Sequence, residues 1–220
     1  MSSETKATFI GAAGYDPNRL SQLEENVSDQ VKNGNYDTNA NLALFRLYNF
    51  APEKANIQAM ATVLIKAQMQ LPNHDFAQLL HLIPERLQEE QPLAALIALT
   101  QHLEGARFQA YWQAADSCRE ILASVPGYYD AIRAYIVLAI SSTCQKFSKQ
   151  LLGECLMLDG PALTKLIEEH KGWAETKAKN GREIVNFPKI EQSATRTQGT
   201  AQGGMKIDMA QLGLLLQTVH

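Results

Sequence analysis

Short amphipathic stretches, each ended by proline, glycine or asparagine, follow one another through residues 15–126 of this chain. Within them apolar residues recur at intervals of three and four, which is the spacing of one face of a helix. Proline and glycine end a helix because one lacks the N–H donor and the other tolerates left-handed backbone. Helices with such short connections pack as antiparallel neighbours. The sequence therefore predicts a mainly α fold with a HEAT-like helical-repeat domain over residues 15–126, after an N-terminal tail at residues 1–14.

Local signals set the expected helix boundaries in this region. Asp16-Pro17 is a cap followed by proline at the first helical position, and Asp37 and Asn73 are further candidate caps. Asn33-Gly34 ends the first helix. The second helix has apolar residues on more than one face, so we expect it to be central in the packing. The expected helices are marked by Leu20–Val31, Leu42–Tyr48, Ile57–Leu71, Phe76–Ile83, Leu93–Leu103 and Phe108–Leu122.

The pattern changes after Pro126-Gly127. Three further helices are expected, over Tyr129–Lys146, Ser148–Leu158 and Ala162–Lys171. The turn Asn180-Gly181 then precedes an alternating apolar stretch, Glu183–Phe187, which is typical of a β-strand. Three helices followed by a β-hairpin is the order of a winged helix. We expect a winged-helix domain with a small β-hairpin over residues 127–190.

A detached helix is predicted at the C-terminus. Residues 191–204 are small and polar, which predicts a flexible linker. After it, at residues 205–220, apolar residues step by four and three along one helical seam, namely Met205, Met209, Leu212, Leu216 and Val219. So short a helix is marginal in water unless it packs on something. It either folds back on its own winged helix or joins a bundle of partner helices; we favour the bundle because the linker gives reach.

Charge and cysteine content restrict the class of protein. The formal net charge of −3 argues against a polyanion-binding surface over the whole molecule, so any nucleic-acid contact is expected to be local. Three widely spaced cysteines, Cys118, Cys144 and Cys155, indicate reduced core thiols. The sequence shows neither a signal peptide nor an apolar run long enough for a membrane span. We expect a cytoplasmic protein, with a nuclear pool allowed and no membrane contact.

No constellation in the sequence predicts catalysis. We find no catalytic, cofactor-binding or metal-ligating residues and expect no cofactor. His74 and His81 are expected seven apart on one face of a single helix, but no third ligand follows at metal spacing. Tyr111 and Trp112 are expected in the core, and His170 at a helix end fits the C-terminal dipole.

Nucleic-acid contacts have two candidate sites. The helix after Asp159 carries Glu168 and Glu169, which argues against reading of a DNA groove. Three cations near the turn of the hairpin could touch an RNA backbone or ribosome, although a solvated turn is the commoner explanation; they are Lys177, Lys179 and Arg182.

Particular strings resemble a known family. Residues 41–50 read NLALFRLYNF and are followed by Pro52, and residues 108–114 read FQAYWQA and are followed by Asp116. Both are similar to runs in the family of subunit K of eukaryotic translation initiation factor 3. Shorter matches are Leu71-Pro72 with Asp75-Phe76, and Lys171-Gly172-Trp173. The similarity extends from Tyr15 to about Phe187, and related families include the smallest subunits of the proteasome lid and of the COP9 signalosome.

The resemblance implies a PCI-type layout, in which helical repeats precede a winged helix. It implies a non-catalytic scaffold subunit that pairs first with subunit L and supports 40S preinitiation complex assembly and mRNA recruitment. C-terminal helices of such subunits gather in a shared bundle, which suits the seam at residues 205–220. The alternatives are a subunit of the proteasome lid or signalosome, or a winged-helix regulator that binds nucleic acid.

Overall fold

The computed structural model describes residues 19–170, 172–177 and 183–188. The predicted N-terminal tail, the linker at 191–204 and the helix at 205–220 therefore lie outside the described residues. The fold is mainly helical with one small sheet, as predicted. The first group of helices comprises α2 (Leu20–Asn33), α3 (Thr38–Phe50), the 3₁₀ turn η3 (Pro52–Lys54), α4 (Ile57–Gln68), α5 (Asp75–Leu80), α6 (Glu85–Gln88), α7 (Leu93–Glu104), α8 (Phe108–Ser117) and α9 (Arg119–Ala123).

Local chemistry sets several of these boundaries as predicted. The Asp37 carboxylate accepts hydrogen bonds from the amides of Asn39 and Ala40 at 3.1 and 3.2 Å, so it caps α3. Helix α2 ends at Gly34, whose φ of +67° is the left-handed conformation that glycine adopts without steric cost. Helix α3 is buried on several sides and lies between α2 and the helices that follow.

Two predictions about these helices were wrong, and one helix was missed. Asn73 does not cap α5, because the chain continues in turns after α4 and the helix begins two residues later, at Asp75. The expected helix over Phe108–Leu122 is two helices, α8 and α9, separated at Cys118. The apolar spacing continues across that break, so periodicity could not reveal it. The short helix α6 was not predicted, since four residues carry no measurable period.

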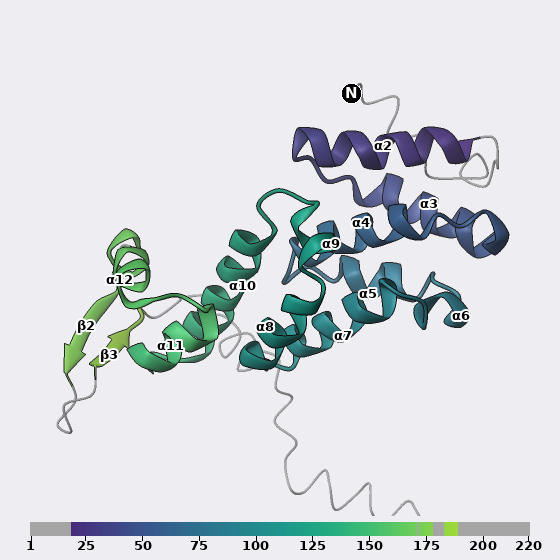
Figure 1. The fold of residues 1–220 in the computed structure, drawn as a ribbon. Helices are drawn as coiled ribbons and strands as arrows, with labels where there is room; N and C mark the ends of the chain where they lie inside the picture. The colour runs from purple at the N-terminus through teal and green to yellow at the C-terminus, as the bar shows by residue number, and fades with distance from the viewer. Residues whose placement is uncertain (1–18, 171, 178–182, 189–220) are drawn as a thin grey trace, which may run out of the picture.

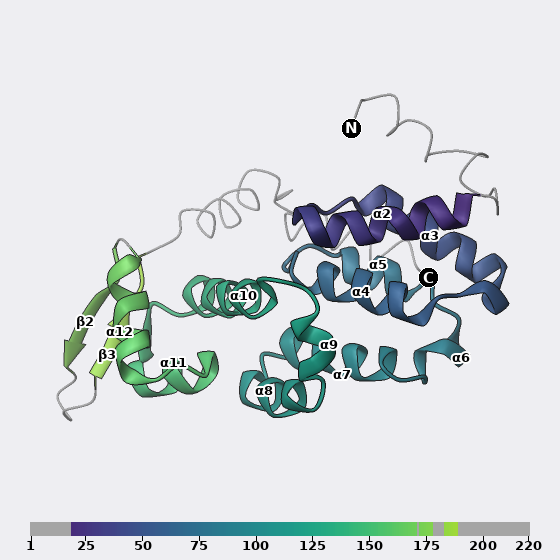
Figure 2. The ribbon, with the colours of Figure 1, turned by 45° about the horizontal axis from the view of Figure 1, so that its top comes forward.

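The N-terminal helices stack in layers that lead to the winged helix (Figures 1 and 2). Helices α2, α3, α5 and α7 follow one another down the stack in Figure 1, and α10 (Tyr128–Thr143) connects it to the remaining elements. In these views α11, α12 and the strands lie at the far end of α10 from α2.

A chain of buried hydrogen bonds ties α10 to the stack. The Tyr111 hydroxyl donates to the Tyr128 hydroxyl at 3.0 Å, and Tyr128 donates to Oε1 of Gln68 at 2.7 Å. Nε2 of Gln68 donates to the Leu96 carbonyl at 2.9 Å and to Oγ1 of Thr100 at 2.7 Å. Buried polar groups must be paired, and these are paired with one another. Four helices, α4, α7, α8 and α10, are thereby fixed in one arrangement.

A buried lysine of α4 donates a hydrogen bond to a carbonyl at the end of α2. Lys66 of α4 is buried, and its ammonium donates to the Gln30 carbonyl at 2.7 Å. That carbonyl belongs to the last turn of α2, where acceptors have no intrahelical partner and a positive charge is favourable. Burial lowers the pKa of Lys66.

The winged helix consists of α10, β1 (Lys146–Ser148), α11 (Lys149–Leu156), α12 (Gly160–Glu169), β2 (Ala174–Lys177) and β3 (Glu183–Asn186). Its antiparallel sheet has the order β1-β3-β2, with Phe147 and Glu175 on either side of Val185. The predicted hairpin is confirmed at β2 and β3. The helix expected over Tyr129–Lys146 ends early, because Lys146 belongs to β1 and pairs with Asn186.

Buried tyrosines make stability sensitive to alkali. Burial raises the pKa of Tyr48, Tyr111 and Tyr128 above their usual value near 10. Above about pH 10 the unfolded chain loses these protons while the folded chain keeps them, so the free energy of unfolding should fall by about 1.4 kcal/mol per pH unit for each tyrosine. The lowered pKa of Lys66 changes the free energy of unfolding in the opposite direction, but it is one group against three tyrosines.

We expect the urea midpoint to drop between about pH 9 and pH 11, with tyrosinate absorbance appearing only as helical circular dichroism is lost. Free titration of all tyrosines near pH 10 in a folded chain would contradict the burial of these hydroxyls.

Candidate interaction surfaces

The winged helix is joined to the stack through Trp112 of α8. Trp112 is 8% exposed, and its Nε1–H donates to the Cys155 carbonyl in α11 at 2.8 Å. The Arg133 guanidinium of α10 lies over the same ring, 5.5 Å from its centroid, and donates through Nε to the Leu156 carbonyl. The prediction that Tyr111 and Trp112 are core residues is confirmed. Because these contacts link α8, α10 and α11, they hold the winged helix at a defined angle.

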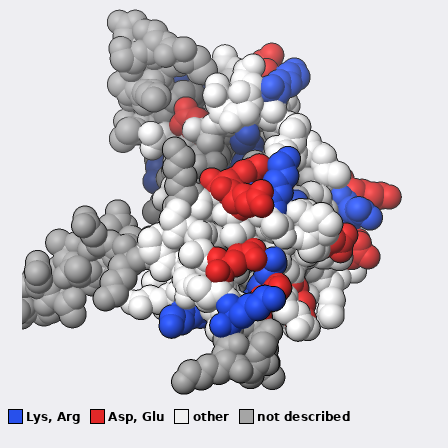
Figure 3. All heavy atoms as spheres, turned by 90° about the vertical axis from the view of Figure 1, so that its left-hand side faces the viewer, with Lys and Arg blue, Asp and Glu red and all other residues white. Residues whose placement is uncertain are grey.

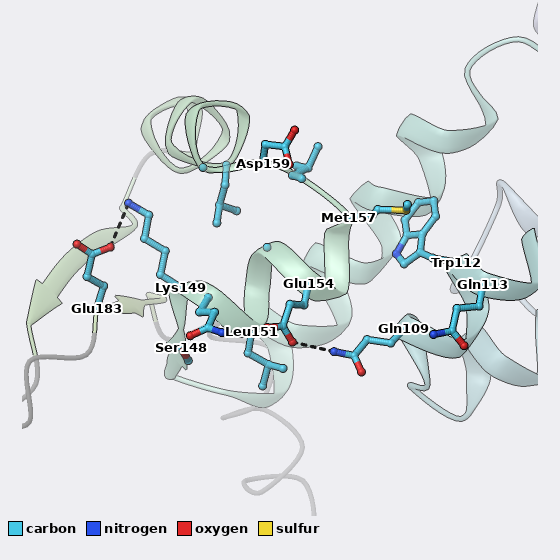
Figure 4. Close-up of a pocket in the computed structure, with 15 residues that line it drawn as sticks. Gln109, Trp112, Gln113, Ser148, Lys149, Leu151, Glu154, Met157, Asp159 and Glu183 are labelled. Atoms are coloured by element: carbon cyan, nitrogen blue, oxygen red, sulfur yellow. Dashed lines mark hydrogen bonds and ion pairs between the residues drawn. The ribbon is translucent and has the colours of Figure 1, made fainter. Parts of the chain in front are cut away.

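A cleft of about 1240 Å³ opens beside this joint, between α8, α11 and the start of α12 (Figure 4). Gln109 lies on the α8 side and donates to the Glu154 carboxylate of α11 at 2.8 Å. The cleft combines apolar side chains with carboxylates. The spacing of residues in the sequence did not predict it. Its walls come from segments about 40 residues apart in the chain, which no local pattern connects.

The charges at the sheet differ from those predicted at the wing. The ammonium of Lys149, at the start of α11, lies 2.9 Å from the Glu175 carboxylate and 3.7 Å from that of Glu183. The hydrogen bond with Glu175 raises the pKa of Lys149. Lys177 is exposed and faces Glu183 across the strands. Lys179 and Arg182 lie outside the described residues, so the predicted cationic cluster stays a prediction.

Helix α12 occupies the position of a recognition helix. Leu163 and Ile167 bury its inner side, and Lys165, Glu168 and Glu169 are exposed. On the face in Figure 3, which shows the winged-helix end, acidic and basic side chains are interspersed. A helix that binds a DNA groove needs cations toward the phosphates. The exposed charges of α12 therefore fit a duplex poorly.

Within the described part of the chain, strand β2 has a neighbouring strand on one side only. It bonds to β3 only, as an outer strand of the described sheet, and all four of its residues are exposed. An outer strand offers free backbone N–H and C=O groups to another chain. This edge is a candidate interaction surface that the sequence analysis did not identify.

The structure places the histidines and cysteines that the sequence analysis considered for chemistry. His74 and His81 flank α5 at its two ends, which corrects the expectation that both lie within one helix. His170 follows α12, with Nδ1 2.9 Å from the Leu166 carbonyl oxygen. Over the described ranges no three metal-ligating side chains cluster. The three cysteines are unpaired, and burial raises the pKa of Cys118 and Cys155, which disfavours the nucleophilic thiolate.

Two further predictions concern the C-terminal seam and membrane spans. The seam residues Met205, Met209, Leu212, Leu216 and Val219 lie outside the described residues, and both of their candidate packing partners stay open. None of the helices in the described part of the chain has the length and apolar character needed to cross a bilayer.

Comparison with known proteins agrees with this architecture. A model of the CSN8/PSMD8/EIF3K family matches residues 54–196. The chain is 37% identical over 155 residues to eukaryotic translation initiation factor 3 subunit K of Drosophila erecta, covering 70% of each protein. It is 34% identical to the subunit K proteins of Xenopus tropicalis, over 80% of this chain and 79% of the relative, and of Homo sapiens, over 74% and 75%. With a family match over more than half its length and such relatives, this chain belongs to the CSN8/PSMD8/EIF3K family.

Proposed function

We propose that this chain is a non-catalytic scaffold subunit of eukaryotic translation initiation factor 3. The observation that carries the proposal is the identity of 34–37% to proteins named subunit K, over 70–80% of the chain. Since the family also includes proteasome-lid and signalosome subunits, the alternative is a scaffold role in one of those complexes. The exposed glutamates of α12 disfavour a regulator that binds duplex DNA.

The geometry suits a subunit that holds others in place. The helical stack and the winged helix, which we assign to residues 15–126 and 127–190, are connected through Trp112 and the buried polar chain at Gln68. Because the helical stack and the winged helix lie at a defined angle, partners bound to each of them are held at a fixed separation. We assign subunit L as the first partner and the open edge of β2 as one surface for it, by strand addition.

The 40S ribosomal subunit is the larger target of the proposed assembly, reached indirectly or by weak contacts at the wing. We place the protein in the cytoplasm, where initiation occurs, with a nuclear pool allowed. Its proposed work, support of preinitiation complex assembly and of mRNA recruitment, consists of binding and requires no catalytic residue or cofactor.

The C-terminal seam provides the test of assembly. Leu212→Asp combined with Leu216→Asp should release the chain from the complex, because burying the five seam side chains gives roughly 8–15 kcal/mol before ordering costs. The melting temperature of the isolated chain should stay nearly unchanged. Release is measured by size-exclusion chromatography of the reconstituted complex. Gln211→Asp with Gln217→Asp, which adds the same charge off the seam, is the control; a large drop in melting temperature for the seam variant would mean that the helix packs on its own chain.

The wing provides the test of ribosome contact. Reversal of Lys177, Lys179 and Arg182 to glutamate should weaken 40S association more than complex assembly, because cation contacts to phosphates are lost. We expect the weakening to disappear at high salt, in a sedimentation assay. The matched control reverses three exposed cations of the helical stack, Lys32, Lys54 and Arg86. Equal behaviour of the two variants would dismiss the wing as a contact.

A further inference from the structure

The cleft beside Trp112 has the character of a docking groove. Of the large hydrophobic side chains that the described residues expose, two line this one cleft: Met157, 65% exposed, and Leu151, 42% exposed. Figure 4 shows both, with the Trp112 ring to one side. Singly exposed apolar residues are ordinary, so the feature that needs an explanation is that two of them share one cleft.

Met157 is held in this position at an energetic cost. It follows α11 with φ of +51° and ψ of +50°, and the amide of Leu158 donates to the Gly153 carbonyl at 3.0 Å. This is the left-handed helix ending in which glycine is the usual residue. A side chain in that conformation costs roughly 1–2 kcal/mol. A strained residue that also exposes a large apolar side chain is poorly explained by stability of the isolated chain.

The charge of the cleft indicates what kind of segment would bind. Glu154 and Asp159 line it, and Glu154 is oriented by the neutral amides of Gln109 and Gln150, which leave its negative charge intact. The cation Lys149 is already engaged by Glu175 and Glu183. A cleft that combines apolar side chains with these carboxylates complements an apolar stripe flanked by Lys or Arg.

We propose that this cleft docks an amphipathic helix of another subunit of the complex, with an apolar residue against Met157 and Leu151 and a Lys or Arg toward Glu154 and Asp159. The inference rests on the proposed function, since it needs a neighbouring subunit. The volume of the cleft, about 1240 Å³, exceeds that of a usual small-molecule pocket. Methionine adapts its shape to an apolar helix face, as in other grooves that bind helices.

The first test uses substitutions at residue 157 in the reconstituted complex. Met157→Gly removes the anchor but suits the left-handed backbone, so the melting temperature of the isolated chain should stay the same or rise. Dissociation of the chain from the complex should become about fivefold faster or more. Met157→Leu keeps an apolar anchor and should dissociate nearly as slowly as the unchanged protein. Unchanged dissociation of the glycine variant would overturn the proposal.

The second test identifies the occupant. A photo-reactive benzoylphenylalanine replaces Met157 in one variant and Leu138, an exposed apolar residue outside the cleft lining, in the control. Illumination of the assembled complex should join Met157→benzoylphenylalanine to a segment of another subunit with apolar residues at helical spacing and a Lys or Arg. Joining to residues 205–220 of the same chain, to a second copy, or to nothing overturns the proposal. If the unchanged chain does not assemble with initiation factor subunits at all, the proposed function fails first.

Discussion

Replacement of Trp112 by alanine is expected to lower the free energy of unfolding by about 3–5 kcal/mol, the usual cost of truncating a buried aromatic ring. The ring is almost fully buried between the helical stack and the winged helix. Its loss removes the packing surface of Arg133 and leaves the Cys155 carbonyl without the donor that now lies 2.8 Å away. One substitution thus weakens the joint between the two parts of the molecule.

Urea denaturation followed by circular dichroism measures this loss. Trp112→Phe keeps most of the apolar area but not the N–H group, so it should cost less, about 1–3 kcal/mol for the unpaired acceptor. Gln113→Ala, at an exposed position of the same helix, is the control and should stay within about 0.5 kcal/mol. A cost below about 1 kcal/mol for Trp112→Ala would contradict the burial of the ring.

Gln68→Leu is the second substitution with a large expected effect, about 2–4 kcal/mol. Gln68 is fully buried, accepts from the Tyr128 hydroxyl, and donates to the Leu96 carbonyl and to Thr100. Leucine fills a similar volume but offers neither donor nor acceptor. In this variant the buried Tyr128 hydroxyl has no acceptor and no access to water. The main cost is the desolvation of this unpaired hydroxyl.

A double-mutant cycle with Tyr128→Phe separates this network from simple packing. In the double variant neither partner leaves the other unpaired. Its loss of unfolding free energy should therefore be smaller than the sum of the two single losses, by about 0.5–3 kcal/mol. Gln58→Leu, at an exposed position of α4, is the control and should stay within about 0.5 kcal/mol. Strict additivity of Gln68→Leu and Tyr128→Phe would show that the buried hydrogen bond contributes nothing.

Features with local causes were predictable from the sequence. The start of α3 at Asp37 and the end of α2 at Gly34 depend on residues next to those boundaries. The winged-helix order followed from three helices and a turn. Strand β1 was missed because three residues carry no pattern of their own; Phe147 is in a strand only because Val185 lies opposite it. The division into domains at residue 126 stays a prediction.

The candidate surfaces were less predictable, because residues far apart in the chain build them. Lys149 meets Glu175 and Glu183 only after the sheet forms, and Gln109 meets Glu154 only after the winged helix packs on α8. The two longest strings behind the family resemblance lie in α3 and α8. Most of the large apolar side chains in the two strings are buried, so those strings report packing and say little about which surfaces meet partners.

The central claim, that the chain is a structural subunit of initiation factor 3, is tested most directly by its partners. The chain is tagged, purified gently from lysate, and its stably bound proteins are quantified by mass spectrometry. We predict near-equal amounts of the other initiation factor 3 subunits, with 40S ribosomal proteins in smaller amounts. Recovery of proteasome-lid or COP9 signalosome subunits in equal amounts instead would contradict the account.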